Sequence, residues 1–283
     1  DFAGQGVVAS LGAILSVSRS RVSDNHSTGL FVFGSGTTLT ASEVWVSGTQ
    51  LDGEGLNGYG VGAQSGASVS LSRSRVSDNY RVGIVAWDAG ASLTASDVWV
   101  SSTKLSGAGL YGHGVLANLG ASLSVSRSRV SDNHNVGLYA SEPDTILTVS
   151  EVWVSGTQPN ADGLQGYGVF AQSGASVSVS RSRVSDNHNT GLFVLGPGTT
   201  ITASEVWVSG TKLNGEGHYG FGVLAKTGAS VSVSRSRVSD NYSAGLLAWG
   251  SGTSLMASEV WVSGTQLNGE DFAGQGVVAS LGA

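Results

Sequence analysis

A long internal repeat constrains the fold of this chain more than any other feature of its sequence. The octapeptide SRSRVSDN occurs five times, with its first arginine at positions 19, 73, 127, 181 and 235, so the repeating unit has 54 residues. The last 13 residues, 271–283, copy residues 1–13 letter for letter, which we interpret as the overlap of a longer super-repeat of 270 residues. Near-identical units bury their apolar faces by stacking on one another, so the repeat predicts a solenoid.

Each unit divides into a short half and a long half. The sequence VSRSRVSDN in the first half aligns with ASEVWVSGT in the second half, 24 residues later, and the second half carries about eight extra residues, first near 50–59. Within each half, apolar and polar residues alternate over three to five positions between Gly, Ser, Asn and Asp, which predicts short strands joined by turns. No stretch has a helical period, so we expect an all-β chain.

The order of motifs within each half resembles a known repeat. Gly-Val-x-Ala, Leu-x-Val and Val-Ser-Asp-Asn follow one another as they do in the right-handed parallel β-helix of the pectin-lyase-like superfamily. The resemblance covers the whole chain and implies one solenoid domain over residues 1–283, with about eleven coils, alternately short and long. Five double-coil units of 54 residues would then be followed by the start of a sixth. The resemblance implies a fold but no activity.

In such a fold, equivalent residues of successive coils stack about 4.8 Å apart, so the repeat alignment predicts contacts. Three inward columns, which begin at Val7, Leu15 and Val22, are apolar in every coil and are the predicted core. At a turn, Asn25 alternates with Thr49 and their equivalents. We expect this polar ladder to form hydrogen bonds along the stack and to satisfy buried turn backbone.

Two outward columns contain ten of the fourteen basic residues. The first column alternates in charge and begins Arg19, Glu43, Arg73, Asp97; the second alternates guanidinium with indole and begins Arg21, Trp45, Arg75, Trp99. We interpret both as structural ladders that fix the register of the coils, because a slip by one coil would place arginine on arginine. The alternative is a strip for single-stranded nucleic acid, but acidic residues in the first column and a net charge of −6 argue against a nucleic-acid partner.

A further outward column and the insertions beside it are the candidate association or binding surface. Its residues are Phe31, Phe33, Trp87, Tyr139, Phe170, Phe193 and Trp249, together with Tyr59, Tyr111, Tyr167 and Tyr219 from the insertions. Left bare, this surface would exceed the few hundred Å² of apolar patch that monomers tolerate. We therefore expect it to be covered, either by the insertions (50–59, 104–113, 158–167, 212–221 and 266–275) or by a second molecule packed laterally, with the remaining apolar edge mediating association.

Other features leave functional alternatives open. The insertions vary most between repeats, which suits either a polysaccharide-binding surface or unconstrained drift. Outward serine columns, such as Ser23, Ser47 and Ser77, form either a plain soluble coat or a hydroxyl array of the kind that ice-binding solenoids present. A calcium ion in the column of Asp24 and Asp78 or in the acidic loops is a further alternative.

Chemistry that an enzyme would need is missing from the sequence. The aspartates of that column recur only on alternate coils, about 9.6 Å apart, which is loose even for the paired carboxylates of an inverting glycosidase. The chain has no cysteine, phosphate-binding loop or GxSxG motif. We therefore predict no catalytic residues and no cofactor. No apolar run approaches the roughly 20 residues that span a membrane, so membrane insertion is not expected.

These observations predict a structural repeat protein rather than an enzyme. We expect an extracellular or cell-surface fibre, filament or adhesin stalk that associates end to end, since neither end has the polar cap that solenoids need for solubility. The first alternative is a carbohydrate-binding adhesin module that uses the insertions. A polysaccharide lyase or hydrolase and an ice-binding protein are further alternatives.

Overall fold

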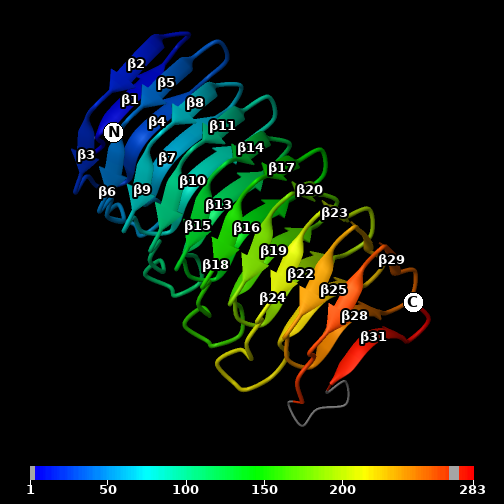
Figure 1. The fold of residues 1–283 in the computed structure, drawn as a ribbon. Helices are drawn as coiled ribbons and strands as arrows, with labels where there is room; N and C mark the ends of the chain where they lie inside the picture. Colours follow the sequence, from blue (N-terminus) through cyan, green and yellow to red (C-terminus); the bar gives the residue numbers. More distant parts are fainter. Residues whose placement is uncertain (1–3, 268–273) are drawn as a thin grey trace.

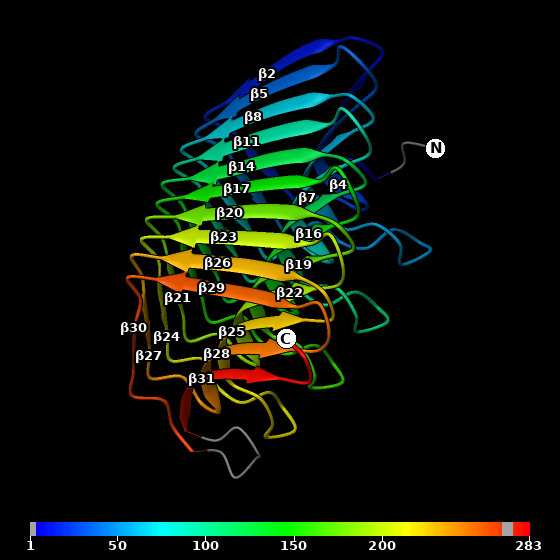
Figure 2. The same ribbon diagram turned by 90° about the vertical axis from the view of Figure 1, so that its right-hand side faces the viewer.

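The computed structural model describes residues 4–267 and 274–283. The chain winds into a solenoid in which each coil contributes one strand to each of three parallel sheets (Figures 1 and 2). Among the described residues there are eleven strands in the first sheet and ten in each of the other two. The prediction of an all-β parallel β-helix is confirmed.

The first sheet contains the longest strands. In spatial order they are β1 (Val7–Ser10), β4 (Thr28–Phe33), β7 (Tyr59–Gln64), β10 (Val82–Trp87), β13 (His113–Asn118), β16 (Val136–Ser141), β19 (Tyr167–Gln172), β22 (Thr190–Leu195), β25 (Phe221–Lys226), β28 (Ala244–Trp249) and β31 (Gln275–Ser280).

The second sheet, seen face-on in Figure 2, follows the first along each coil. Its strands are β2 (Ile14–Ser18), β5 (Thr38–Ser42), β8 (Ser68–Ser72), β11 (Ser92–Ser96), β14 (Ser122–Ser126), β17 (Ile146–Ser150), β20 (Ser176–Ser180), β23 (Thr200–Ser204), β26 (Ser230–Ser234) and β29 (Ser254–Ser258).

The third sheet has strands of only three residues. They are β3 (Arg21–Ser23), β6 (Trp45–Ser47), β9 (Arg75–Ser77), β12 (Trp99–Ser101), β15 (Arg129–Ser131), β18 (Trp153–Ser155), β21 (Arg183–Ser185), β24 (Trp207–Ser209), β27 (Arg237–Ser239) and β30 (Trp261–Ser263).

The register follows the repeat alignment. Val100 of β12 pairs with Val76 of β9 on one side and with Val130 of β15 on the other, and all three are fully buried. Leu93 in the second sheet and Ile84 in the first sheet belong to the same core and are at most 1% exposed. β-Branched and leucine side chains stacked in this way form one continuous core along the axis.

The predicted asparagine–threonine ladder forms at the turn after the third sheet, and its two residue types behave differently. Asn79 accepts a hydrogen bond from the backbone N–H of Thr49 (3.0 Å) and donates one to the carbonyl of Val46 (3.4 Å). Asn133, Asn187 and Asn241 repeat the arrangement. The hydroxyl of Thr49, by contrast, is buried without a hydrogen-bond partner. The amides, not the hydroxyls, therefore satisfy the turn backbone.

The insertions of the long coils leave the solenoid between the third and first sheets and project from one side of it (Figure 2). They contact one another although they are two coils apart. The backbone N–H of Ala161 donates to the carbonyl of Gly109 (3.2 Å), and that of Gly215 donates to Gly163 (2.7 Å). The loops therefore form a ridge along the axis. Most of the fifth insertion, residues 268–273, lies outside the described residues.

Candidate functional site

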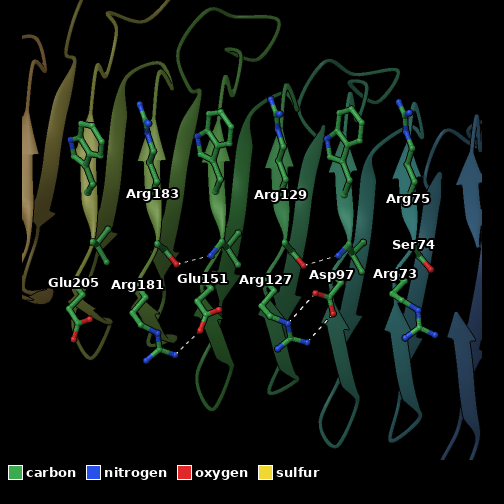
Figure 3. A pocket seen from close by; sticks show the side chains of 18 of the residues that line it. Arg73, Ser74, Arg75, Asp97, Arg127, Arg129, Glu151, Arg181, Arg183 and Glu205 are labelled. Carbon is green, nitrogen blue, oxygen red and sulfur yellow. Dashed lines mark hydrogen bonds and ion pairs between the residues drawn. The ribbon is translucent and has the colours of Figure 1, made fainter. Parts of the chain in front are cut away.

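A groove runs along the outside of the solenoid where the second sheet turns into the third. It has a volume of about 2000 Å³ and is lined from Arg19 to Glu259 by the two predicted ladders. Between the ladders its floor alternates serine with valine, as in Ser74 and Val98, both of which are buried. Figure 3 shows the two rows of side chains on either side of this floor. We call this surface the arginine groove.

One wall of the arginine groove is the charge ladder. Four of its five arginines pair with the acid of the preceding coil, and the N–O distances are 3.3 Å for Arg73–Glu43, 2.9 Å for Arg127–Asp97, 3.2 Å for Arg181–Glu151 and 3.6 Å for Arg235–Glu205. Arg127 donates two hydrogen bonds to Asp97, which hold the pKa of that carboxyl below its ordinary value and raise the pKa of the guanidinium. These pairs are solvent-exposed, so each contributes less than about 1 kcal/mol.

The other wall is an unbroken stack of guanidinium and indole. The guanidinium carbon of Arg129 lies 4.5 Å from the ring centre of Trp153 and 5.5 Å from that of Trp99, so one cation is held between two indoles. Arg75 and Arg183 are held in the same way. In Figure 3, Arg129 and Arg183 each stand between two indole rings, and Arg75 stands beside one indole at the end of the same row.

Each indole in this wall is also fixed by a hydrogen bond that the sequence did not predict. Trp153 donates its Nε1–H to the hydroxyl of Ser185 (3.1 Å), and Trp45, Trp99 and Trp207 donate to the equivalent serines. This contact corrects the expectation of an exposed serine coat in that column, because Ser77 and Ser131 are fully buried. Both faces of these four rings are covered by arginine, so none of the four has a face free to stack on a nucleobase.

Replacing Trp153 by alanine is expected to lower the free energy of unfolding by about 2 kcal/mol. The substitution removes two cation–π contacts and one hydrogen bond, each worth roughly 0.5–1 kcal/mol. Urea denaturation measures the loss. Trp261→Ala is the matched control, because Trp261 is 68% exposed and its expected loss is under about 1 kcal/mol. Equal losses from the two substitutions would contradict a stabilising role for the stack.

The predicted association surface on the first sheet is largely buried by its own side chains. Phe31, Phe170, Phe193 and Tyr59 are 7–9% exposed, whereas Phe33, Trp87, Tyr139, Trp249, Tyr111 and Tyr167 are half-buried and Tyr219 is 40% exposed. Phe170 stacks on Phe193 at 4.8 Å and on Tyr139 at 5.2 Å. Burial raises the pKa of Tyr167 to about 12. The patch therefore needs no partner to remove it from water.

The cover comes from the insertions and from neighbouring rings of the first sheet. Tyr167, at the end of an insertion, contacts Phe170, and Tyr59 contacts Trp87, which in turn covers Phe31. At Gly62 the absent side chain leaves room for the ring of Phe31, which a Cβ at that position would meet at 2.7 Å. What remains exposed on this surface includes Tyr219 (40%) and loop leucines such as Leu56 (54%).

Over residues 4–267 and 274–283, no three or more histidine, aspartate or glutamate side chains gather where they could hold a metal ion. The same residues contain no helix with the length and apolarity needed to cross a membrane. The aspartates considered as calcium ligands, in the column of Asp24 and Asp78, lie on alternate coils and do not gather around one point.

Comparisons with known proteins agree with this architecture. A family model described as a right-handed β-helix region matches residues 5–208 and, in a second match, residues 160–267. No curated protein matches the sequence.

Proposed function

Because the chain belongs to the family of right-handed β-helix regions, we propose that it is a structural repeat protein without enzymatic activity. In this proposal it forms an extracellular or cell-surface fibre, filament or adhesin stalk. The same family fold also serves enzymes, so the proposal rests on this chain's own residues. The observation that carries the proposal is that the coils repeat one another. Both walls of the arginine groove repeat the same groups from Arg19 to Glu259, and among the described residues no three or more histidine, aspartate or glutamate side chains gather where they could hold a metal ion.

The end coils support growth along the axis. Leu15, Val17, Leu255 and Val262 point inward but are only partly buried, whereas their equivalents in interior coils are at most 4% exposed. A further coil stacked on either end would bury these side chains and pair the open strand edges, which otherwise favour association. In this proposal another copy of the chain supplies that coil.

Electron microscopy of the purified chain tests this proposal. Ten coils at about 4.8 Å give a rod of about 50 Å, and we expect rods several times longer. Leu15→Lys places a charge on the open end and is expected to leave rods of single length. Ser16→Lys, which places the same charge outward on the neighbouring residue, is expected to leave long rods intact. A uniform population of single-length rods from the unmodified chain would overturn the proposal.

A second candidate is a carbohydrate-binding adhesin module that uses the ridge of insertions. The observation that favours it is the hydrogen bonding of the second loop to the third and of the third to the fourth, with Tyr219 exposed on the fourth. A glycan array separates the two: specific binding that Tyr219→Ala abolishes would favour the module. Release of sugar fragments from acidic or neutral glycans would instead indicate a lyase or hydrolase, and thermal hysteresis would indicate ice binding.

A further inference from the structure

The charge of the arginine groove is opposite to that of the rest of the molecule. Its lining contains ten arginines against five carboxylates, a net charge of +5, although the whole chain carries −6, so the remaining charged residues carry −11. The charge ladder contains five arginines and five acids, so its charges cancel. The excess of +5 therefore comes from the five arginines of the guanidinium–indole wall. The groove is therefore a positive line on a negative surface.

The arginines of the guanidinium–indole wall have no counter-ion within the described part of the chain. They are Arg21, Arg75, Arg129, Arg183 and Arg237. None of them makes an ion pair with another described residue, and Nε of Arg75 is buried without a hydrogen-bond partner. Indoles cover both flat faces of the three interior arginines and one face of the two end ones, Arg21 and Arg237, which leaves the N–H edges unused. Like charges about 9.6 Å apart repel one another, so anions at the same spacing would stabilise the row.

A row of aspartates on the same coils has the opposite sign and the same period. Asp24, Asp78, Asp132, Asp186 and Asp240 each lie three residues after one of these arginines, just beyond the third sheet. All are exposed except Asp78, which is half-exposed, and none forms an ion pair with a described residue. The next coil leaves space for them, because Oδ1 of Asp24 lies where a Cβ on Gly48 would be 2.5 Å away.

We propose that the arginine groove docks the aspartate row of a second, parallel copy of this chain. With the two copies at equal height, all five arginines meet aspartates at once. A shift by one coil would instead place each arginine opposite the neutral residue of the intervening coil, such as Gly48 or Ser102. Docking is therefore restricted to shifts of whole double coils, and five weak contacts act as one multivalent contact.

The arginines of the groove and the aspartate row lie at opposite ends of the three-residue strands of the third sheet. Each copy therefore carries both partners of the contact, the groove that receives and the row that docks. The inference rests on the proposed structural role and names the partner that bundles the rods. The positive charge of the groove would also attract a linear polyanion. Nucleobases would find no free indole face to stack on in the interior coils, because both faces of those indoles are already covered.

Sedimentation velocity at two salt concentrations tests the proposal. At about 0.01 M salt the screening length is about 30 Å and side-by-side association is expected; at about 1 M it is about 3 Å and the association is expected to be lost. Replacing the five aspartates by asparagine (Asp24→Asn, Asp78→Asn, Asp132→Asn, Asp186→Asn, Asp240→Asn) is expected to weaken the low-salt association about 100-fold or more.

The matched control removes five acids elsewhere: Glu54→Gln, Glu142→Gln, Asp144→Asn, Asp162→Asn and Glu216→Gln. Both variants have the same net charge of −1, since each loses five of the acids that give −6. If net charge alone governed association, both would associate more strongly than the unmodified chain; the proposal expects a loss only in the aspartate-row variant. Equal behaviour of the two variants, or no association at low salt, would overturn it.

Two further results distinguish lateral docking from the fibre proposal and from binding of an external polyanion. Long single rods that never pair, seen by electron microscopy at low salt, would overturn lateral docking and leave the fibre proposal standing. Binding of polyglutamate to an otherwise unassociated chain would show that the groove takes an external polyanion, and would likewise overturn docking of a second copy.

Discussion

Replacing Gly137 by alanine is expected to lower the free energy of unfolding by about 3 kcal/mol, as an overpacked core does. Gly137 is the second residue of β16, and an added Cβ would lie 2.7 Å from the carbonyl oxygen of Gly168 and 2.7 Å from Cγ1 of Val154. One of these neighbours is backbone of the next coil. It moves only if the two coils separate, which would stretch the hydrogen bonds between them. Urea denaturation followed by circular dichroism measures the change.

Gly53→Ala is the matched control for this substitution. Gly53 lies in an insertion, its backbone is not left-handed, and a Cβ added there would have no other atom within 4 Å. Its expected effect is within about 0.5 kcal/mol. If Gly137→Ala and Gly53→Ala were equally stable, the space between the coils at Gly137 would be large enough for a Cβ, and the prediction would be wrong. The signal was available in the sequence, because glycine occupies the position of Gly137 in every coil.

The period of the sequence was sufficient to predict which residues share a column along the solenoid axis. Since the coils stack along one axis, a residue and its repeat equivalent become neighbours, and the contact of Arg129 with Trp153 follows from counting residues. The repeat period does not predict whether an arginine of the charge ladder pairs with the acid of the preceding coil or with that of the following coil. The choice of Glu43 rather than Asp97 by Arg73 depends on side-chain rotamers, about which a periodic pattern holds no information.

Alternation of inward and outward positions was a weaker guide to burial. It placed Ser77 outward, but the indole of Trp45 folds over its hydroxyl and excludes water. It also placed Phe31 outward, where rings from adjacent columns cover it. In both cases the size of the neighbouring side chains decides the exposure, whereas alternation specifies only the direction in which a side chain leaves the strand.

A second large effect is expected from His113, the first residue of β13. Its ring is 3% exposed and lies between Tyr111 and Tyr139, with ring centres 5.6 Å and 5.1 Å away. Its Nδ1 has no hydrogen-bond partner. Burial, and secondarily the positive charge of Arg81, lowers the pKa of His113 from 6.5 to about 3. The imidazole therefore stays neutral in the folded chain at pH values where it is protonated in the unfolded chain.

This difference in protonation makes stability depend on pH in a known direction. Above pH 6.5 the imidazole is neutral in both states and has no effect; as the pH falls from 6.5 towards 3, only the unfolded chain gains the proton, and folding stability is lost by about 1.4 kcal/mol per pH unit. At pH 4 the loss due to His113 is expected to be about 3 kcal/mol. Carboxylates contribute a further loss that does not involve this residue.

His113→Tyr isolates the contribution, because tyrosine occupies the same position at Tyr59 and Tyr167 and fits the surrounding aromatic cluster. The variant is expected to match the unmodified chain at pH 7 and to exceed it by about 3 kcal/mol at pH 4, since the shared carboxylate terms cancel in the comparison. Urea denaturation of both chains at the two pH values measures this difference. Parallel stability curves over that range would mean that the imidazole is protonated in the folded chain, which its burial against Tyr139 without a hydrogen-bond partner for Nδ1 argues against.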